Sequence, residues 1–311
     1  MDLEKFIKVR SPLPVPKLNY CSLPTKDLDY GAIPELTDFG HDDSRLETVD
    51  HKFRGGEDAA LKQLKYYLWD TDYVSKYKET RNGLLGWDFS TKFSPYLAHG
   101  CLSPKMVYHE IKRYEKERTK NNSTYWVIFE LMWRDFFRLM GKKFGNRIFL
   151  KGGLNQQPKD LSNNMEVFQI WAEGRTGVPF IDANMRQLNQ TGFMSNRGRQ
   201  NVASFLVHDL NINWRIGAEY FESLLLDYDP CSNYGNWNYV SGVGNDPRED
   251  RYFNVIKQAQ RYDPEGAYIK TWLPELKALP IHTLFDPTSY AEEIQSEYGI
   301  TLGQEYPKSI L

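Results

Sequence analysis

The sequence predicts an all-α fold, and the periodicity of its apolar residues is the main reason. Two stretches carry apolar side chains three or four positions apart: Val202, Phe205, Leu206 and Leu210, and then Ile216, Tyr220, Phe221 and Leu224. This spacing is typical of helices with one buried face. No alternation of apolar and polar residues continues beyond a few positions, and no internal repeat is present. Strands and repeat architectures are therefore not expected.

Composition limits the broad class of the protein. The chain has 311 residues, enough for one large core or two domains, and a net charge of −2. Aromatic residues reach 14 %, with 8 Trp and 20 Tyr, which suggests stacking surfaces as well as a core. The three cysteines, Cys21, Cys101 and Cys231, are widely spaced and predict free thiols in a reducing compartment.

Several common sites and targeting signals are absent from the sequence. No apolar run approaches the length of a membrane span, and the N-terminus lacks a secretory signal. We therefore expect an intracellular protein, with nucleus, cytoplasm and organelle all left open. No Cys/His metal spacing, P-loop or GxSxG motif occurs, so no metal is predicted. The GVGN at 242–245 lacks the strand and helix of a dinucleotide fold.

The chain divides into three expected segments. Residues 1–55 hold Pro12, Pro14, Pro16, Pro24 and Pro34 and an acidic run, which indicates an extended arm or an interdomain linker. Helical character begins at Gly56 and is expected to continue to residue 285. Residues 286–311 are expected to form a polar tail.

A loop rich in glycine and proline follows the first expected helix, in the stretch YKETRNGLLGWDFSTKFSPYLAHGCLSP. Ser90, Thr91 and Ser94 crowd hydroxyl and amide groups around Lys92. Such a loop can bind a phosphate through amides, hydroxyls and a cation. The alternative is an ordinary serine-rich loop.

The helix TYWVIFELMWRDFFRLMGKKFG places a carboxylate on an aromatic stripe. Trp126, Glu130, Trp133 and Phe137 are four, three and four residues apart, so they share one face. A carboxylate there is costly without a partner. Glu130 could pair with Arg134 within the helix, or it could form the floor of a cavity beside a stacking Trp. A local basic region is also expected: Arg138, Lys142, Lys143, Arg147 and Lys151, joined by Arg186, Arg197 and Arg199.

Charged and amide residues flank the two periodic stretches: Asn196, Arg197, Arg199, Asp227, Asp229 and Asn233. Arg and Asp are rarely buried without a partner. These residues could form a structural salt-bridge cluster, or they could line a site for a large polar aromatic ligand.

Four segments together resemble the photolyase/cryptochrome family, and more narrowly its DASH branch: GLLGWDFSTKFSPYLAHGCLSP, FELMWRDFFR, TGVPFIDANMRQLNQTGFMSNRGRQNVASF and DYDPCSNYGNWNY. The resemblance covers about Gly55 to Pro280 and keeps its motifs in order. It implies the family's all-helical FAD-binding domain. The implied FAD-binding residues are Tyr77, Ser90, Thr91, Lys92, Phe93, Ser94, Asn196, Arg199, Asp227, Asp229 and Asn233. Arg199 and Asp227 are expected to pair beside the flavin ring.

The resemblance also implies roles in catalysis and DNA binding. Glu130, Trp133 and Asn233 are expected to be catalytic. The expected DNA contacts are Glu130, Trp133, Arg134, Phe137, Asn196, Arg197 and Tyr239. Trp237 and Trp214 match the inner members of an electron relay. Leu161 stands ten residues before Trp171, where an outer Trp is expected, so the relay departs from the family there.

The implied reaction is blue-light-driven repair of cyclobutane pyrimidine dimers, preferentially in single-stranded DNA, by electron transfer from excited reduced flavin. The alternatives are a cryptochrome photoreceptor that binds DNA or RNA without repair, and a helical scaffold without catalysis. A monomer is expected. Because the chain begins in what resembles a linker, the antenna pigment methenyltetrahydrofolate is not expected on it.

Overall fold

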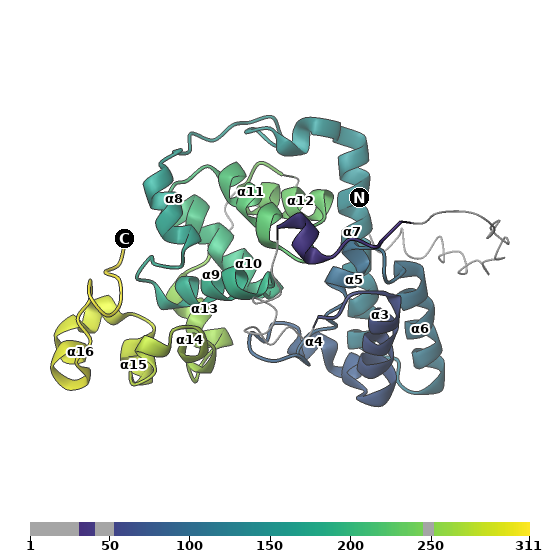
Figure 1. The fold of residues 1–311 in the computed structure, drawn as a ribbon, viewed down its shortest axis with the longest axis horizontal. Helices are drawn as coiled ribbons and strands as arrows, with labels where there is room; N and C mark the ends of the chain where they lie inside the picture. Colours follow the sequence, from purple (N-terminus) through teal and green to yellow (C-terminus); the bar gives the residue numbers. More distant parts are fainter. Residues whose placement is uncertain (1–30, 41–52, 245–251) are drawn as a thin grey trace.

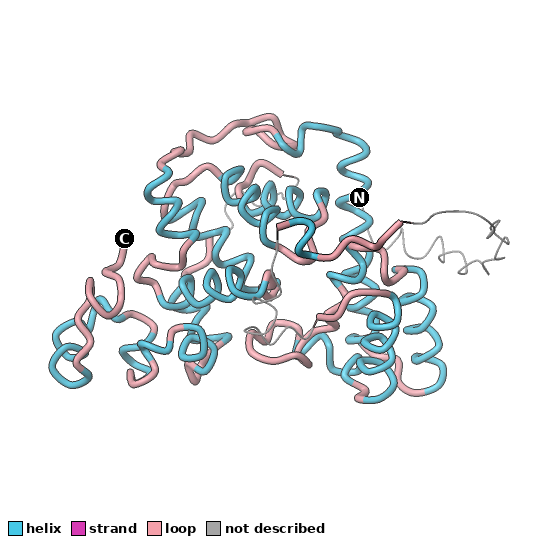
Figure 2. The backbone as a smooth tube through the Cα atoms, viewed as in Figure 1, coloured by secondary structure: helices cyan, strands magenta, loops and turns pink. Residues whose placement is uncertain are grey.

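The computed structural model describes residues 31–40, 53–244 and 252–311, and over these ranges the fold is helical. Figure 2 shows helices joined by loops and no strand in the described part of the chain. Two isolated bridges occur there, Ser162 with Ile212 and Leu302 with Tyr306. The all-α prediction is confirmed. Most of the expected arm lies outside the described residues; its short 3₁₀ helix η1 spans Leu36–Phe39.

The first part of the chain builds a small helical cluster, shown on the right of Figure 1. Its elements are α3 (Glu57–Lys65), the π-helical turn η2 (Tyr66–Asp70), η3 (Tyr73–Lys76), α4 (Tyr77–Thr80), α5 (Ser94–Ala98) and α6 (Pro104–Glu117). Tyr67, Leu68, Val107 and Ile111 are fully buried among them. Leu61, on α3, keeps 37 % of its surface exposed.

Helix α7 (Asn122–Phe144) connects the two halves of the fold. It begins at a capping box, in which the Asn121 side chain accepts from the Thr124 amide and the Thr124 hydroxyl accepts from the Asn121 amide. α7 packs against α4 and α6 on one side and against α12 on the other.

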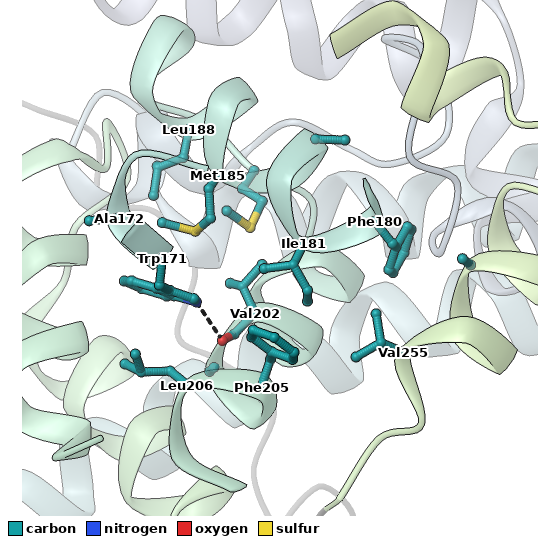
Figure 3. Packing of buried hydrophobic residues seen from close by; sticks show 14 of the residues in the cluster. Trp171, Ala172, Phe180, Ile181, Met185, Leu188, Val202, Phe205, Leu206 and Val255 are labelled. Atoms are coloured by element: carbon teal, nitrogen blue, oxygen red, sulfur yellow. Dashed lines mark hydrogen bonds between the residues drawn. The ribbon is translucent and has the colours of Figure 1, made fainter. Parts of the chain in front are cut away.

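The second half holds the larger hydrophobic cluster. Its first elements are η4 (Gly145–Phe149), α8 (Met165–Ala172), α9 (Pro179–Thr191), α10 (Asn196–Ser204), the π-helical turn η5 (Phe205–Asp209), α11 (Trp214–Leu224) and α12 (Pro230–Val240). Trp171, Phe180, Phe205 and Leu206 are fully buried in its centre (Figure 3). Gly217 lets α11 approach α12, because a Cβ there would lie 2.4 Å from the Trp237 ring.

The C-terminal helices belong to the same core. They are α13 (Val255–Tyr262), α14 (Ala267–Trp272), η6 (Pro274–Leu276), α15 (Ile281–Leu284), η7 (Pro287–Tyr290) and α16 (Ala291–Tyr298). Ile294, Ile300 and Tyr306 are buried in the larger cluster. The Tyr306 hydroxyl donates to the buried Asp182 carboxylate at 2.6 Å. Residues 286–311 thus differ from the expected polar tail, because apolar residues spaced along them fill the core.

Candidate functional site

A cavity of about 440 Å³ lies between α7, α10, α11 and α12. Eleven of the residues that the sequence analysis assigned to sites line it: Glu130, Trp133, Arg134, Phe137, Asn196, Arg199, Asp227, Asp229, Asn233, Trp237 and Tyr239. They come from three separate stretches of the chain, 130–137, 196–199 and 227–239. Their convergence makes this cavity the candidate site.

One wall carries a buried ion pair. Arg199 on α10 donates from Nη2 to Asp227 Oδ2 at 2.9 Å, and its Nε donates to the Met194 carbonyl. The Asp227 side chain is 4 % exposed. Its other oxygen, Oδ1, is buried and has no partner among the described residues. The expected pairing of Arg199 with Asp227 is present, and it leaves one carboxylate oxygen available to a ligand.

Helix α12 supplies the adjoining wall. Asp229 is its N-cap and accepts from the Ser232 amide at 2.8 Å, while Arg138 of α7 reaches its second oxygen at 3.2 Å. Burial tends to raise the pKa of Asp229, but the Ser232 and Arg138 donors bring it below its usual value. Asn233, one turn into the helix, is held by an Nδ2 donation to the Ala218 carbonyl at 3.0 Å. Both residues are fixed by the backbone before any ligand binds.

The opposite side is formed by the aromatic stripe of α7. The Trp133 ring lies 5.9 Å from Phe137, and Tyr239 lines the cavity from α12. Glu130 lines the same cavity and forms an ion pair with Arg81, the C-cap of α4. Burial raises the pKa of Glu130, and the Arg81 charge partly offsets that rise.

The expected pair of Glu130 with Arg134 is not formed. Arg134 instead donates to the Leu97 carbonyl at 3.2 Å and lies near Asp135. Arg81 comes from a segment interpreted as loop, where its approach to α7 could not be foreseen. The carboxylate is thus paired, but across the cavity edge and not within its own helix.

The expected phosphate loop lies beside the cavity and does not line it. Lys92 has a left-handed backbone with φ of 56°, is buried, and donates to the Ser90 hydroxyl at 3.0 Å. The Phe93 amide donates to the Thr91 hydroxyl, and Ser94 begins α5. The Phe193 ring lies under both Lys92 and Arg199, 5.1 and 5.7 Å away, so the loop adjoins the ion-pair wall.

Three other assigned residues also lie outside the cavity lining. Tyr77 is buried in the smaller cluster. Arg197 is directed to Asn82 and Gln200 and stacks on Tyr262. Trp214 is buried and donates to the Lys151 carbonyl. Other residues that line the cavity were not predicted from the sequence: Arg81, Phe129, Gln200, Ala203, Phe221, Leu225, Tyr228, Ser232, Asn236, Val240 and Phe253. Helical spacing from Asn196 and Arg199 could have indicated Gln200 and Ala203.

Comparison with known proteins agrees with this geometry. Residues 126–311, which contain every cavity residue except Arg81, match the FAD binding domain of DNA photolyase. The chain belongs to the photolyase/cryptochrome family. This family member is 53 % identical over 290 residues to cryptochrome DASH of Danio rerio, a match covering 93 % of the chain and 56 % of the relative. It is 56 % identical over 256 residues to cryptochrome DASH of Synechocystis, covering 82 % and 52 %.

Solved structures show the same fold. The Synechocystis cryptochrome superposes with a TM-score of 0.82 at 55 % identity, covering 84 % of this chain and 54 % of that one. A bacterial class III photolyase from Agrobacterium tumefaciens gives 0.81 at 30 % identity, covering 89 % and 58 %. The chain spans about half the length of these relatives. No described helix has the length and apolar character needed to cross a bilayer.

The cavity fits a flavin. The unpartnered Asp227 Oδ1 can accept from a ring N–H, and the Arg199 guanidinium beside it can face ring carbonyls. The buried ammonium of Lys92 suits the phosphates of FAD, which would replace part of the hydration it has lost.

If Lys92 contacts the FAD phosphates, FAD affinity is expected to depend on pH. Burial lowers the pKa of Lys92 to about 8. A bound phosphate favours the charged form of Lys92. Above this pH the Lys92 amine is mostly neutral, so it must take up a proton when FAD binds, whereas below this pH it already carries the proton. We expect affinity for FAD to fall as pH rises past this value, by up to about tenfold per pH unit. Titrating apoprotein with FAD across the range measures this.

Lys92→Met should bind FAD more weakly at neutral pH and lose the pH dependence, whereas Lys62→Met, on the exposed face of α3, should keep both. An unchanged pH profile in Lys92→Met would contradict the assignment of Lys92 to the phosphates.

Proposed function

We propose that the protein binds FAD in this cavity and uses blue light to repair cyclobutane pyrimidine dimers, preferentially in single-stranded DNA. The observation that carries the proposal is that one cavity holds both the ion-pair wall suited to a flavin and a carboxylate among stacking rings. A protein that only signalled through its flavin would have no need of a polar group for a substrate base.

The cofactor wall orients the flavin. Arg199 and Asp227 would hold the flavin ring, and Asn233 would place a neutral amide near its N5, where it can accommodate the reduced anionic flavin. When bound and reduced, FAD supplies the light-excited electron that opens the cyclobutane ring and is then returned. No proton transfer to the protein is required, so the side chains act by position and charge.

The substrate side would receive the two fused pyrimidines. Trp133 and Tyr239 offer ring faces for stacking, and Glu130 offers oxygen atoms to the polar edge of a base. Arg81 holds the Glu130 carboxylate in place before the substrate arrives. Asn196, the first residue of α10, lines the cavity and would touch the substrate as well as the flavin.

A preference for single strands follows from the cost of taking a dimer out of a duplex, about a few kcal/mol, which a single strand largely avoids. Exposed basic residues at the end of α7 can contact the backbone phosphates: Lys142, Lys143, Arg147 and Lys151. We therefore expect the protein to act as a monomer, and its affinity for single-stranded DNA to fall steeply as the salt concentration rises.

The deciding experiment is repair of an irradiated oligothymidylate. Purified protein should be yellow, release FAD on denaturation, and restore thymines under blue light with a reductant present. Bound, fully reduced FAD without restoration of thymines would favour the photoreceptor that binds DNA or RNA. A colourless and stably folded protein would favour the scaffold.

A further inference from the structure

A continuous series of aromatic rings leads from the cavity to the protein surface, and it does not pass through Trp214. Trp237 lines the cavity. Its ring centroid lies 6.5 Å from that of Trp171, which is fully buried, and the Trp171 centroid lies 5.9 Å from that of Tyr220. Tyr220 is partly exposed. Phe221 fills the angle between the two tryptophans, 5.2 Å from Trp237 and 6.4 Å from Trp171.

We propose that Trp171 and Tyr220 form an electron route from the surface to Trp237. The inference rests on the proposed function, since it needs a light-excited oxidised flavin in the cavity as the oxidant. Trp and Tyr are the side chains most easily oxidised by one electron, and electron transfer between them weakens steeply with separation. Rings in contact can therefore pass a hole stepwise over a distance that a single step would cross slowly.

The hydrogen bonds of the two residues give the route a direction. Trp171 Nε1 donates to the Val202 carbonyl at 3.0 Å inside the core (Figure 3). A carbonyl is no base, so an oxidised Trp171 keeps its proton and remains a cation in a medium that disfavours charge. Tyr220 donates its hydroxyl to Asn189 at 2.7 Å, and Asn189 is exposed. Its proton can leave to water, which traps the hole there as a neutral radical.

The electrons and protons balance over the route. Trp237 gives one electron to the excited flavin, Trp171 gives one to Trp237, and Tyr220 gives one to Trp171. The Tyr220 O–H bond breaks, and its proton passes to solvent. In sum the flavin gains one electron, and Tyr220 loses one electron and one proton. An external thiol restores Tyr220 by giving up a hydrogen atom.

A second possible series of rings, through Trp214, would end at a different tyrosine. The Trp214 ring lies 6.3 Å from Tyr234, which is buried and donates to Glu222 at 2.9 Å. Leu161, at the position where the resemblance places an outer Trp, is a buried apolar residue that cannot be oxidised in this way. The two branches thus end at different tyrosines, and these can be distinguished by substitution.

The test compares Trp171→Phe and Tyr220→Phe with Trp214→Phe and Tyr234→Phe. The phenylalanines keep a ring in each position but are far harder to oxidise. FAD content is measured in each variant, then photoreduction under blue light with a thiol, and then the radicals formed after a flash by transient absorption and electron paramagnetic resonance. In the wild type we expect a tryptophan radical cation that converts to a neutral tyrosyl radical.

Trp171→Phe should slow photoreduction severalfold, and Tyr220→Phe should remove the tyrosyl signal and prolong the tryptophan radical, with FAD content unchanged in both. Tyr234→Phe should keep the tyrosyl signal. The route would be overturned if Trp171→Phe and Tyr220→Phe formed the same radicals as the wild type while Trp214→Phe lost them. Repair of oligothymidylate by the wild type would in that case still support the proposed function. A wild-type chain that holds no FAD would overturn both.

Discussion

An Asp227→Asn chain is expected to purify with little flavin and to unfold more easily than the wild type. The substitution keeps the shape of the side chain but removes the charge that Arg199 faces at 2.9 Å. Breaking a buried pair costs about 3–5 kcal/mol, and we expect the lower end because Arg199 is 24 % exposed and keeps its bond to Met194. Loss of a charged acceptor should weaken FAD binding by about 1.5–3 kcal/mol.

FAD released on denaturation and the free energy of unfolding of the apoprotein measure the two effects separately. Glu219→Gln is the matched control, because Glu219 pairs with Arg215 at 3.9 Å on the exposed face of α11. Such surface pairs contribute little, so this variant should keep both its flavin and its stability. Full flavin content in Asp227→Asn would contradict the assignment of this wall to the cofactor.

Glu130→Gln should retain its flavin and lose most of its activity on pyrimidine dimers. The amide replaces one carboxylate oxygen by a donor, so a base edge that both oxygens contact would lose about 1–3 kcal/mol of binding. Dimer affinity should then fall roughly tenfold to a hundredfold, and the quantum yield of repair should fall with it. Binding of an irradiated oligothymidylate, repair yield per absorbed photon and FAD content are the three measurements.

Glu79→Gln provides the control for this experiment. Glu79 lies on α4 near Arg81, but its carboxylate accepts from the Ser123 hydroxyl and does not line the cavity. That variant should match the wild type in all three measurements. If Glu130→Gln lost flavin and repair in equal proportion, Glu130 would be a structural partner of Arg81 and not a substrate contact.

Local signals in the sequence predicted much of the fold. The helical periods at 202–224 and the amide cap before residue 122 act over three or four positions, and both appear in the structure. The cap was foreseeable because Asn121 and Thr124 satisfy each other's backbone within one turn. The C-terminal segment was misjudged because its buried residues, Ile294, Ile300 and Tyr306, are separated by polar ones, and their burial depends on distant helices.

For the site too, contacts within one helix could be predicted from the sequence, whereas contacts between distant segments could not. The stripe of Trp126, Glu130, Trp133 and Phe137 follows from helix geometry, and all four residues line the cavity. The partner of Glu130 did not follow, because Arg81 is 49 positions away and an equally reasonable Arg134 stands one turn along the helix. The role of each residue in catalysis or DNA binding rests on the family resemblance and stays a prediction.

Helix α7 contributes Val127 and Ile128 to the smaller hydrophobic cluster, packs against α12 of the larger one, and also forms one side of the cavity. Cofactor retention and global folding are therefore linked through a single element, and occupancy of the cavity should raise the stability of the whole chain. An amino-acid change far from the cavity that loosens either cluster would then appear first as a loss of yellow colour. In a genetic screen, colonies that lack the yellow colour would consequently carry changes in helix packing as often as changes in the residues that line the cavity.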